Sequence, residues 1–196
     1  MSNATAVEKL IPIGVSGRHV HVSQEDLELV FGSGYQLTKM KDLSQPGQFA
    51  SNETVDLVTT KGTFAKVRIL GPVRKETQVE LALTDAVKLG ITPPIRDSGN
   101  LHDSPGLTLV GPNGTVVVPR GVIIACRHVH MTPVEAASYG VNDKDWVKLE
   151  CDGERSMTMG KVLVRVNESF ALECHIDTDE GNAASLKTGD RVRLIK

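Results

Sequence analysis

A six-residue phrase occurs twice in this chain and carries four of its six histidines. It reads Gly-Arg-His-Val-His-Val at residues 17–22 and Cys-Arg-His-Val-His-Met at residues 126–131. Side chains i and i+2 of a β-strand point to the same face, so each His-Val-His presents two imidazoles side by side. The valine between them points to the opposite face, where it packs in a core. The duplication predicts two related β-structured halves.

A helix-start signal follows each copy of the phrase. Ser23 has Asp26 three positions on. Thr132 is followed directly by Pro133 and has Glu135 three positions on. A hydroxyl N-cap, an acid in the first turn and proline at the first helical position are typical of helix N-termini. We therefore predict helices over residues 24–31 and 133–138.

Most of the remaining sequence predicts short β-strands. Its segments are rich in Val, Ile, Leu and Thr and are separated by Gly, Pro, Asn or Asp. Helical segments do not alternate with the strands, which argues against a parallel βαβ fold. We predict a mainly β protein with two small related β-barrel subdomains capped by short α-helices. The predicted strands cover residues 11–22, 54–60, 64–70, 77–83, 107–110, 115–119, 122–130, 146–150, 156–166, 171–176 and 191–195.

A polar, proline-rich stretch from residue 92 to 106 marks the boundary between the halves. The predicted organisation is an N-terminal tail over 1–10, a first β-barrel half over 11–104 and a second over 105–196. Strands of one half are free to pair with the other.

Composition restricts the partners and the compartment. A net charge of −2 gives no attraction to nucleic acid or anionic membranes, and an aromatic content of 4% disfavours base stacking. No apolar run reaches the roughly 18 residues of a membrane span, and residues 1–10 do not resemble a signal peptide. Three cysteines without a framework spacing indicate a reduced, cytoplasmic protein. We expect no nucleic-acid or membrane partner, and a homodimer stays open.

The two His-Val-His pairs point to metal binding. Imidazole is a common zinc ligand, and histidine is a poor residue to retain twice for packing alone. Two histidines do not complete the coordination of a metal ion, so neighbouring strands must supply further ligands. His175 is a good candidate in the second half, and Glu80 holds roughly the matching place in the first. The spacing fits a solvent-facing Glu80 equally well.

Three other residues have two interpretations each. Arg74 follows a Leu-Gly-Pro turn and either binds phosphate through its guanidinium or is a solvated charge. Cys126 lies two and four residues before His128 and His130, so on one strand the three side chains would share a face. It either faces the same site as these histidines or is a plain buried thiol. His102 lies in the polar stretch, where we expect it to be exposed and not a ligand.

Further motifs run in order from residue 11 to residue 196. They are Ser16–His21, Leu43–Phe49, Leu70–Arg74, Thr77–Glu80, Ile95–Gly99, Cys126–Met131 and Asp177–Ala183. With these motifs the chain resembles the PduL-type phosphate propanoyltransferases, which are metal-dependent phosphotransacylases. The resemblance implies two small β-barrels and the reversible reaction of acyl-CoA with phosphate to give acyl phosphate and CoA.

The resemblance also implies a set of site residues. It implies two zinc ions in one site, with coenzyme A as a substrate or product, and Arg74 matches the catalytic, phosphate-binding arginine. The matching zinc ligands are His19, His21 and Glu80 for one ion, and His128, His130 and His175 for the other. The matching coenzyme A contacts are Val15, Ser16, Gly17, Lys61, Arg68 and Asn182.

The chain departs from the family pattern in two places. Gly181 stands where alanine is expected, which changes little. Only about ten residues precede Ile11, whereas members packaged in bacterial microcompartments carry a longer amphipathic extension. This favours the cytoplasm over the microcompartment lumen.

Two other functions stay open from the residues themselves. One is a metal-dependent hydrolase of a thioester or amide that uses zinc-bound water. His-x-His also opens amidohydrolase barrels, but these need about 250 residues and alternating βα units. The other is a non-catalytic, metal-stabilised binding module. Structural zinc sites are usually rich in sulfur, so histidine and carboxylate ligands favour an open, reactive site.

Overall fold

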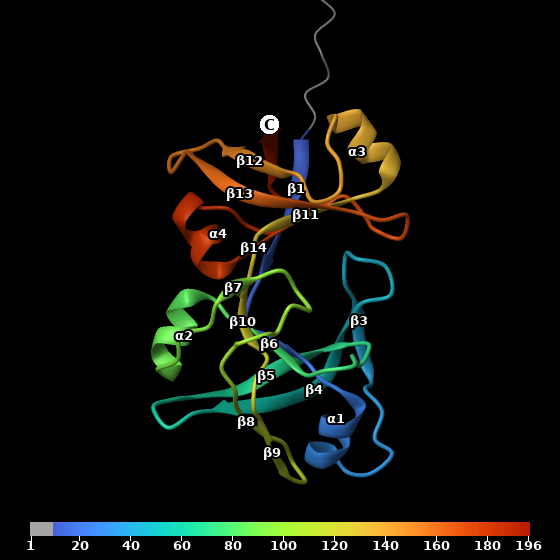
Figure 1. Ribbon diagram of the computed structural model, residues 1–196, viewed down its shortest axis with the longest axis vertical. Helices are drawn as coiled ribbons and strands as arrows, with labels where there is room; N and C mark the ends of the chain where they lie inside the picture. The colour runs from blue at the N-terminus through green and yellow to red at the C-terminus, as the bar shows by residue number, and fades with distance from the viewer. Residues whose placement is uncertain (1–9) are drawn as a thin grey trace, which may run out of the picture. The chain divides into compact units, whose positions relative to one another are not determined.

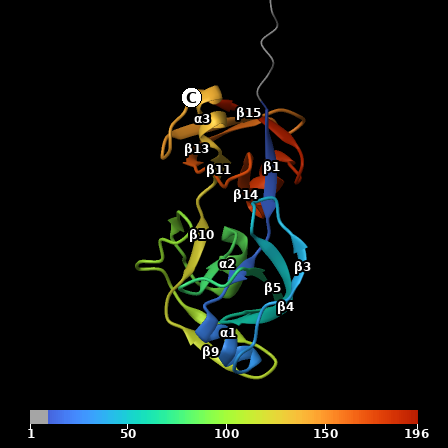
Figure 2. The same cartoon turned by 90° about the vertical axis from the view of Figure 1, so that its right-hand side faces the viewer.

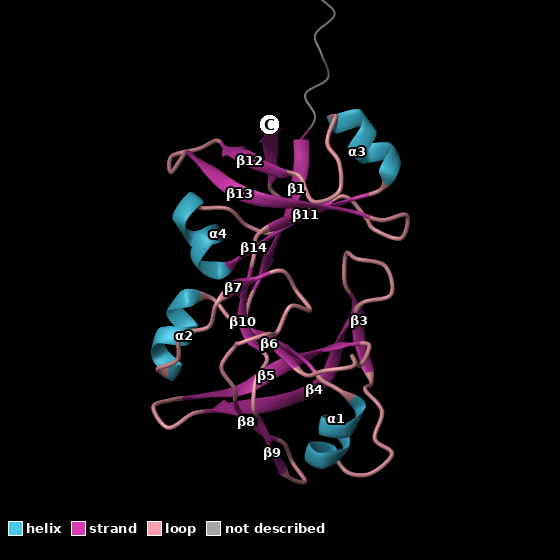
Figure 3. Cartoon of the chain, in the orientation of Figure 1, coloured by secondary structure: helices cyan, strands magenta, loops and turns pink. Residues whose placement is uncertain are grey.

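The computed structural model describes residues 10–196 (Figure 1). Strands make up most of the regular structure, and the helices of the described residues are short (Figure 3). The predicted mainly β class is therefore confirmed. The described chain divides into two compact units. We call residues 10–15, 127–176 and 180–196 the barrel unit, and residues 16–126 and 177–179 the sheet unit.

The barrel unit contains a closed barrel with the strand order β1-β14-β11-β13-β12-β15. Its first and last strands in sequence, β1 and β15, pair antiparallel and complete the ring. The elements are β1 (Leu10–Ser16), β11 (His128–Met131), α3 (Pro133–Tyr139), β12 (Trp146–Cys151), β13 (Met157–Val166), β14 (Glu173–Asp177), α4 (Thr178–Ala184) and β15 (Arg191–Ile195).

The sheet unit is built on one open sheet with the strand order β7-β10-β6-β2-β5-β4-β8-β9, and β3 pairs with β4. The elements are β2 (His19–His21), α1 (Gln24–Phe31), β3 (Lys39–Asp42), β4 (Phe49–Val58), β5 (Thr63–Gly71), β6 (Gln78–Glu80), α2 (Leu83–Leu89), β7 (Ile95–Arg96), β8 (Leu107–Val110), β9 (Thr115–Val118) and β10 (Val122–Ala125).

The two units repeat the same three-strand arrangement around their histidine pairs. In the sheet unit, β2 lies between β5, which is parallel to it, and β6, which is antiparallel. In the barrel unit, β11 lies between β13 and β14 with the same directions. Lys66 and Lys161 stand at matching points of β5 and β13, and both have a φ of +56°. The internal repeat predicted from sequence is therefore a structural repeat.

Each unit has its own hydrophobic core, to which its histidine strand contributes. Val20 and Val129, the central residues of the two His-Val-His segments, are fully buried. Burying one such side chain contributes roughly 1.5 to 3 kcal/mol. The core thus fixes which face of each strand the histidines occupy.

The predicted helix starts are confirmed. Ser23 accepts a hydrogen bond from the backbone N–H of Asp26, and Thr132 forms a capping box with Glu135. At its other end, α1 lies beside β9 (Figure 2), where the backbone N–H of Asn113 donates to the carbonyl of Val30.

Several predicted boundaries are wrong. The strands predicted over residues 11–22 and 122–130 each divide in two, with breaks at 17–18 and at 126–127. The strand predicted over 77–83 is shorter, because Leu83 already begins α2. Helices α2 and α4 and strands β3 and β7 were not predicted.

The predicted halves over residues 11–104 and 105–196 stay a prediction. The predicted N-terminal tail falls outside the described residues, except for Leu10, which begins β1. Within residues 10–196, no helix has the length and apolar character needed to cross a membrane.

Candidate metal centre

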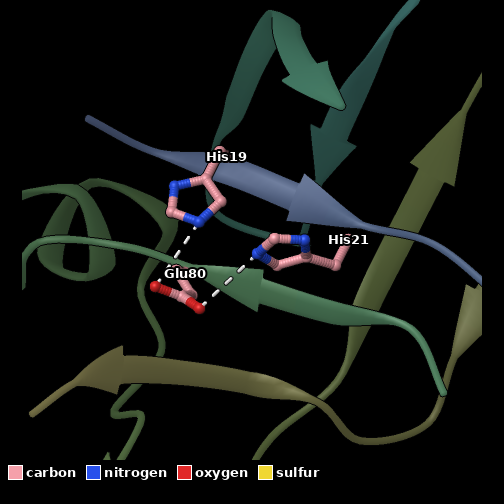
Figure 4. A group of neighbouring side chains, drawn as sticks. All are labelled: His19, His21 and Glu80. Atoms are coloured by element: carbon pink, nitrogen blue, oxygen red, sulfur yellow. Dashed lines mark ion pairs between the residues drawn. The ribbon is translucent and has the colours of Figure 1, made fainter. Parts of the chain in front are cut away.

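The first predicted ligand set meets across two neighbouring strands. β2 pairs antiparallel with β6, and this register places His19 opposite Glu80. The Nε2 atom of His19 lies 3.4 Å from Oε2 of Glu80, and that of His21 lies 3.8 Å from Oε1 (Figure 4). All three donor atoms lie within 4.8 Å of one another. Glu80 therefore faces the histidines with a side chain that is 13% exposed, and not the solvent.

The charges in this group are strongly coupled. Burial alone would raise the pKa of Glu80, but His19, His21 and Arg74 together outweigh it and bring that pKa well below its usual range. Burial disfavours the charged form of His19, yet the Glu80 carboxylate more than offsets this and raises the pKa of His19. Burial together with His19 and Arg74 lowers the pKa of His21 to about 3. Glu80 as an anion and His21 as a neutral imidazole have the protonation states that a metal ion requires, whereas His19 loses its favoured proton when an ion binds.

A hydrogen-bond network holds Glu80 in place. The side-chain amide of Gln78 donates to Oε1 of Glu80 at 2.5 Å, and the Ser98 hydroxyl lies 3.2 Å from the same oxygen. The Gln78 amide also lies 2.8 Å from the Ser98 Oγ. Neither Gln78 nor Ser98 has a role predicted from the sequence. The signal that points to them is their place in the motifs Thr77–Glu80 and Ile95–Gly99.

Arg74 is anchored beside this network. Its backbone N–H donates to the carbonyl of Val22 at 2.8 Å, and its guanidinium donates to the Ser98 hydroxyl at 3.1 Å. It is half-buried, whereas its neighbour Lys75 is exposed. The backbone of Arg74 thus pairs with the segment that directly follows β2, and its side chain approaches the Glu80 network.

The second predicted ligand set lies in the barrel unit. β11 pairs with β14 so that His128 is opposite His175. The ring centroids of His128, His130 and His175 lie 4.7 to 5.2 Å apart. Burial and the other two imidazoles lower the pKa of His130 to about 2, so its ring is neutral at physiological pH.

Two buried nitrogens of the second set have no hydrogen-bond partner among the described residues. They are Nδ1 of His130 and Nε2 of His175. Buried polar atoms without a partner are rare and call for an explanation, such as a bound ion. Neutral imidazoles with open nitrogens fit a zinc ion. Among residues 10–196, however, only the first set brings its three donor atoms within 4.8 Å of one another.

The predicted coenzyme A contacts are distributed over both units. Val15 and Asn182 belong to the barrel unit, and Ser16, Gly17, Lys61 and Arg68 to the sheet unit. Arg68 is the register partner of His19 on β5, and its guanidinium donates to the backbone carbonyls of residues 51 and 52 at 3.0 and 2.8 Å. Lys61 lies in the turn between β4 and β5, where its side chain packs against Gly90.

The remaining candidates differ in their surroundings. Cys151 and Cys174 are buried, and burial raises the pKa of both thiols. Cys126 is half-buried. The His102 side chain is 77% exposed, as predicted.

Comparisons with known proteins identify the family of this chain. A family model described as phosphate propanoyltransferase matches residues 12–187. A phosphate propanoyltransferase of Thermotoga maritima is 57% identical over 95% of this chain and 89% of its own length. Enzymes of the same name from Priestia megaterium and Rhodopseudomonas palustris are 52% and 51% identical, over 97% and 95% of this chain and 88% and 82% of their own lengths. The chain therefore belongs to the phosphate propanoyltransferase family and is an acyltransferase.

Proposed function

We propose that this chain catalyses the reversible reaction of an acyl-CoA with phosphate, which gives acyl phosphate and free CoA. The acyl group is propanoyl or a similar short chain, as the name of the relatives suggests. The observation that carries the proposal is the buried group of His19, His21 and Glu80, with the Arg74 guanidinium anchored next to it.

The proposal includes two zinc ions per chain, one held by each ligand set. Bound zinc supplies a Lewis acid that polarises a thioester carbonyl and stabilises a thiolate. The first set is supported by its converging donor atoms, and the second by its two unpartnered nitrogens. The three protein ligands of the first set leave a coordination position open, as catalytic zinc sites do and closed structural sites do not.

In this proposal Arg74 binds the phosphate. A guanidinium offers two parallel N–H donors that match a phosphate dianion. Its backbone hydrogen bond to Val22 and its contact with Ser98 limit the positions that the guanidinium takes up. Holding phosphate in one orientation beside the thioester contributes several kcal/mol to the lowering of the barrier.

Phosphate attacks the thioester directly in this proposal, without an acyl-enzyme. A cysteine nucleophile acts as its thiolate. Burial disfavours the thiolate of Cys151 and Cys174 by raising their pKa values, so neither suits that role. Coenzyme A is assigned to the segment Val15, Ser16 and Gly17 with Lys61, Arg68 and Asn182.

The test is an assay of acyl-phosphate formation over a series of acyl-CoAs, with zinc measured on the same sample. We expect CoA release to require phosphate and to be matched by acyl phosphate, with short chains preferred. Release of CoA at the same rate without phosphate would instead show a hydrolase. Absence of any turnover by zinc-loaded protein would show a binding module.

A further inference from the structure

The second ligand set has a carboxylate at a position where the first set, compared through the structural repeat, has none. In β6, Gln78 and Glu80 point to the same face, with Gln78 opposite His21. In β14, Glu173 and His175 occupy the matching positions, with Glu173 opposite His130. In the sheet unit the third ligand is itself the carboxylate, Glu80. In the barrel unit the third ligand is His175, and the carboxylate, Glu173, thus lies two residues earlier in the strand.

Glu173 lies beside His175, the third histidine of the second set. Its Oε2 atom is 3.0 Å from Nε2 of His175, and its side chain is only 12% exposed. Yet Nε2 has no hydrogen-bond partner among the described residues, so the carboxylate lies beside this nitrogen and not along its hydrogen-bonding direction. Donors that share one ion at about 2.1 Å lie roughly 3.0 to 3.4 Å apart, and the distance between Oε2 of Glu173 and Nε2 of His175 falls within this range.

Gly14 leaves the space that the Glu173 carboxylate occupies. It lies in β1, the barrel neighbour of β14, and is buried. A Cβ atom at Gly14 would lie 2.9 Å from Cδ of Glu173 and 3.1 Å from each carboxylate oxygen. Glycine is disfavoured inside a strand unless another group approaches the backbone closely. The close approach here is that of the carboxylate.

We propose that Glu173 is the anionic member of the cation site formed by His128, His130 and His175, and that Gly14 keeps its carboxylate there. This inference rests on the second metal site of the proposed function. A site made of three neutral imidazoles alone would carry no ligand charge, whereas the sheet unit's set carries the negative charge of Glu80. With Glu173 included, each unit offers one carboxylate to its ion. A negative charge at low exposure strengthens the binding of a dication.

The experiment measures zinc binding to one site at a time. The double substitution His19→Ala and His21→Ala removes the sheet unit's site, and zinc is then titrated into the metal-free protein against a competing chelator. In this background we expect Glu173→Gln to lower zinc affinity at least tenfold, on the scale seen when groups around metal ligands are lost. Gly14→Ala should lower it as well, because the new methyl group displaces the carboxylate.

Two matched controls accompany these variants. Gly160→Ala adds a methyl group elsewhere in the barrel unit, where the new Cβ meets no atom within 4 Å. Glu154→Gln removes an exposed carboxylate of the same unit. Both should bind zinc as the background protein does.

Each result bears on the inference separately from the proposed function. Unchanged zinc affinity in a folded Glu173→Gln variant would overturn the role of Glu173. If that variant does not fold, Gly14→Ala decides the question in the same way, since the three atoms nearest to its methyl group belong to the end of a flexible side chain. If the background protein binds no zinc, the second metal site of the proposed function fails, and the inference fails with it.

Discussion

At the scale of single residues, strand pairing settled what spacing had left open. Alternation along a strand shows that Glu80 and Gln78 share a face, but it does not show which face is buried. The register of β6 against β2 answers this, because it places Glu80 opposite His19. Ser98 was harder to predict, since it reaches Glu80 from a loop some 18 residues away in sequence. Charged and hydroxyl-bearing residues in such loops do not recur at a regular spacing, so the sequence does not show which of them reach a site.

Arg74 gives the residue-scale prediction. Arg74→Ala removes the proposed phosphate contact, so we expect kcat/KM for phosphate to fall by about two orders of magnitude, with zinc content unchanged. Arg74→Lys keeps the charge but loses the paired donors, and should recover only part of the loss. Lys75→Ala, at the exposed neighbouring position, should behave as wild type. Wild-type phosphate kinetics in Arg74→Ala would make Arg74 a structural residue only.

At the scale of elements, the two helices with hydroxyl N-caps, α1 and α3, were predicted, whereas α2 and α4 were missed. Ala82 precedes α2 and provides no side-chain cap. Long-range ion pairs hold the two missed helices instead. Arg18 pairs with Asp85 of α2, and Arg127 pairs with Glu180 of α4, both at 2.7 Å. Each arginine directly precedes its His-Val-His, so each pair ties a histidine strand to a helix of the repeat.

The Arg18–Asp85 pair can be tested by its contribution to stability. Asp85 is buried, and the Arg18 guanidinium also lies over the Phe64 ring at 4.2 Å. Asp85→Asn should lower the free energy of unfolding by about 1 to 2 kcal/mol, because a buried partner of a charged group is lost. Asp42→Asn breaks an exposed pair with Lys39 and should cost less than about 0.5 kcal/mol. Equal urea midpoints for the two variants would contradict this account.

At the scale of the whole molecule, the repeat and the mainly β class were predictable, and the pairing order was not. The duplicated phrase and the strand-rich composition are local signals. The pairing of Leu10 with Arg193 joins opposite ends of the sequence and completes the barrel. No local pattern encodes such a contact, because it depends on how all the intervening strands pack. The same limit applies to the open sheet, whose edges are set by tertiary pairing.

The buried histidines predict how stability depends on pH in the metal-free protein. Burial brings the pKa of His21 to about 3 and that of His130 to about 2, whereas both titrate near 6.5 in an unfolded chain. The unfolded state therefore binds more protons below pH 6.5, and stability falls as the pH decreases towards 3. His21 and His130 each lower the free energy of unfolding by about 1.4 kcal/mol for every pH unit of acidification in this range.

Urea unfolding in the presence of a chelator between pH 7.5 and 4.5 measures this loss. His130→Gln should reduce the slope of stability against pH by one histidine's share. His102→Gln, at an exposed position, should leave the slope as it is. Identical slopes for wild type and His130→Gln would show that His130 does not resist protonation in the folded state.

The central claim is that each copy of the duplicated phrase binds its own metal ion. Elemental analysis of zinc per folded chain after metal loading and removal of excess tests it most directly. We predict two zinc ions per wild-type chain, one per His19→Ala chain and one per His128→Ala chain, because each substitution removes a ligand from a different unit. His102→Ala serves as the control and should retain two. At most one ion in the folded, fully loaded wild-type protein would contradict the account.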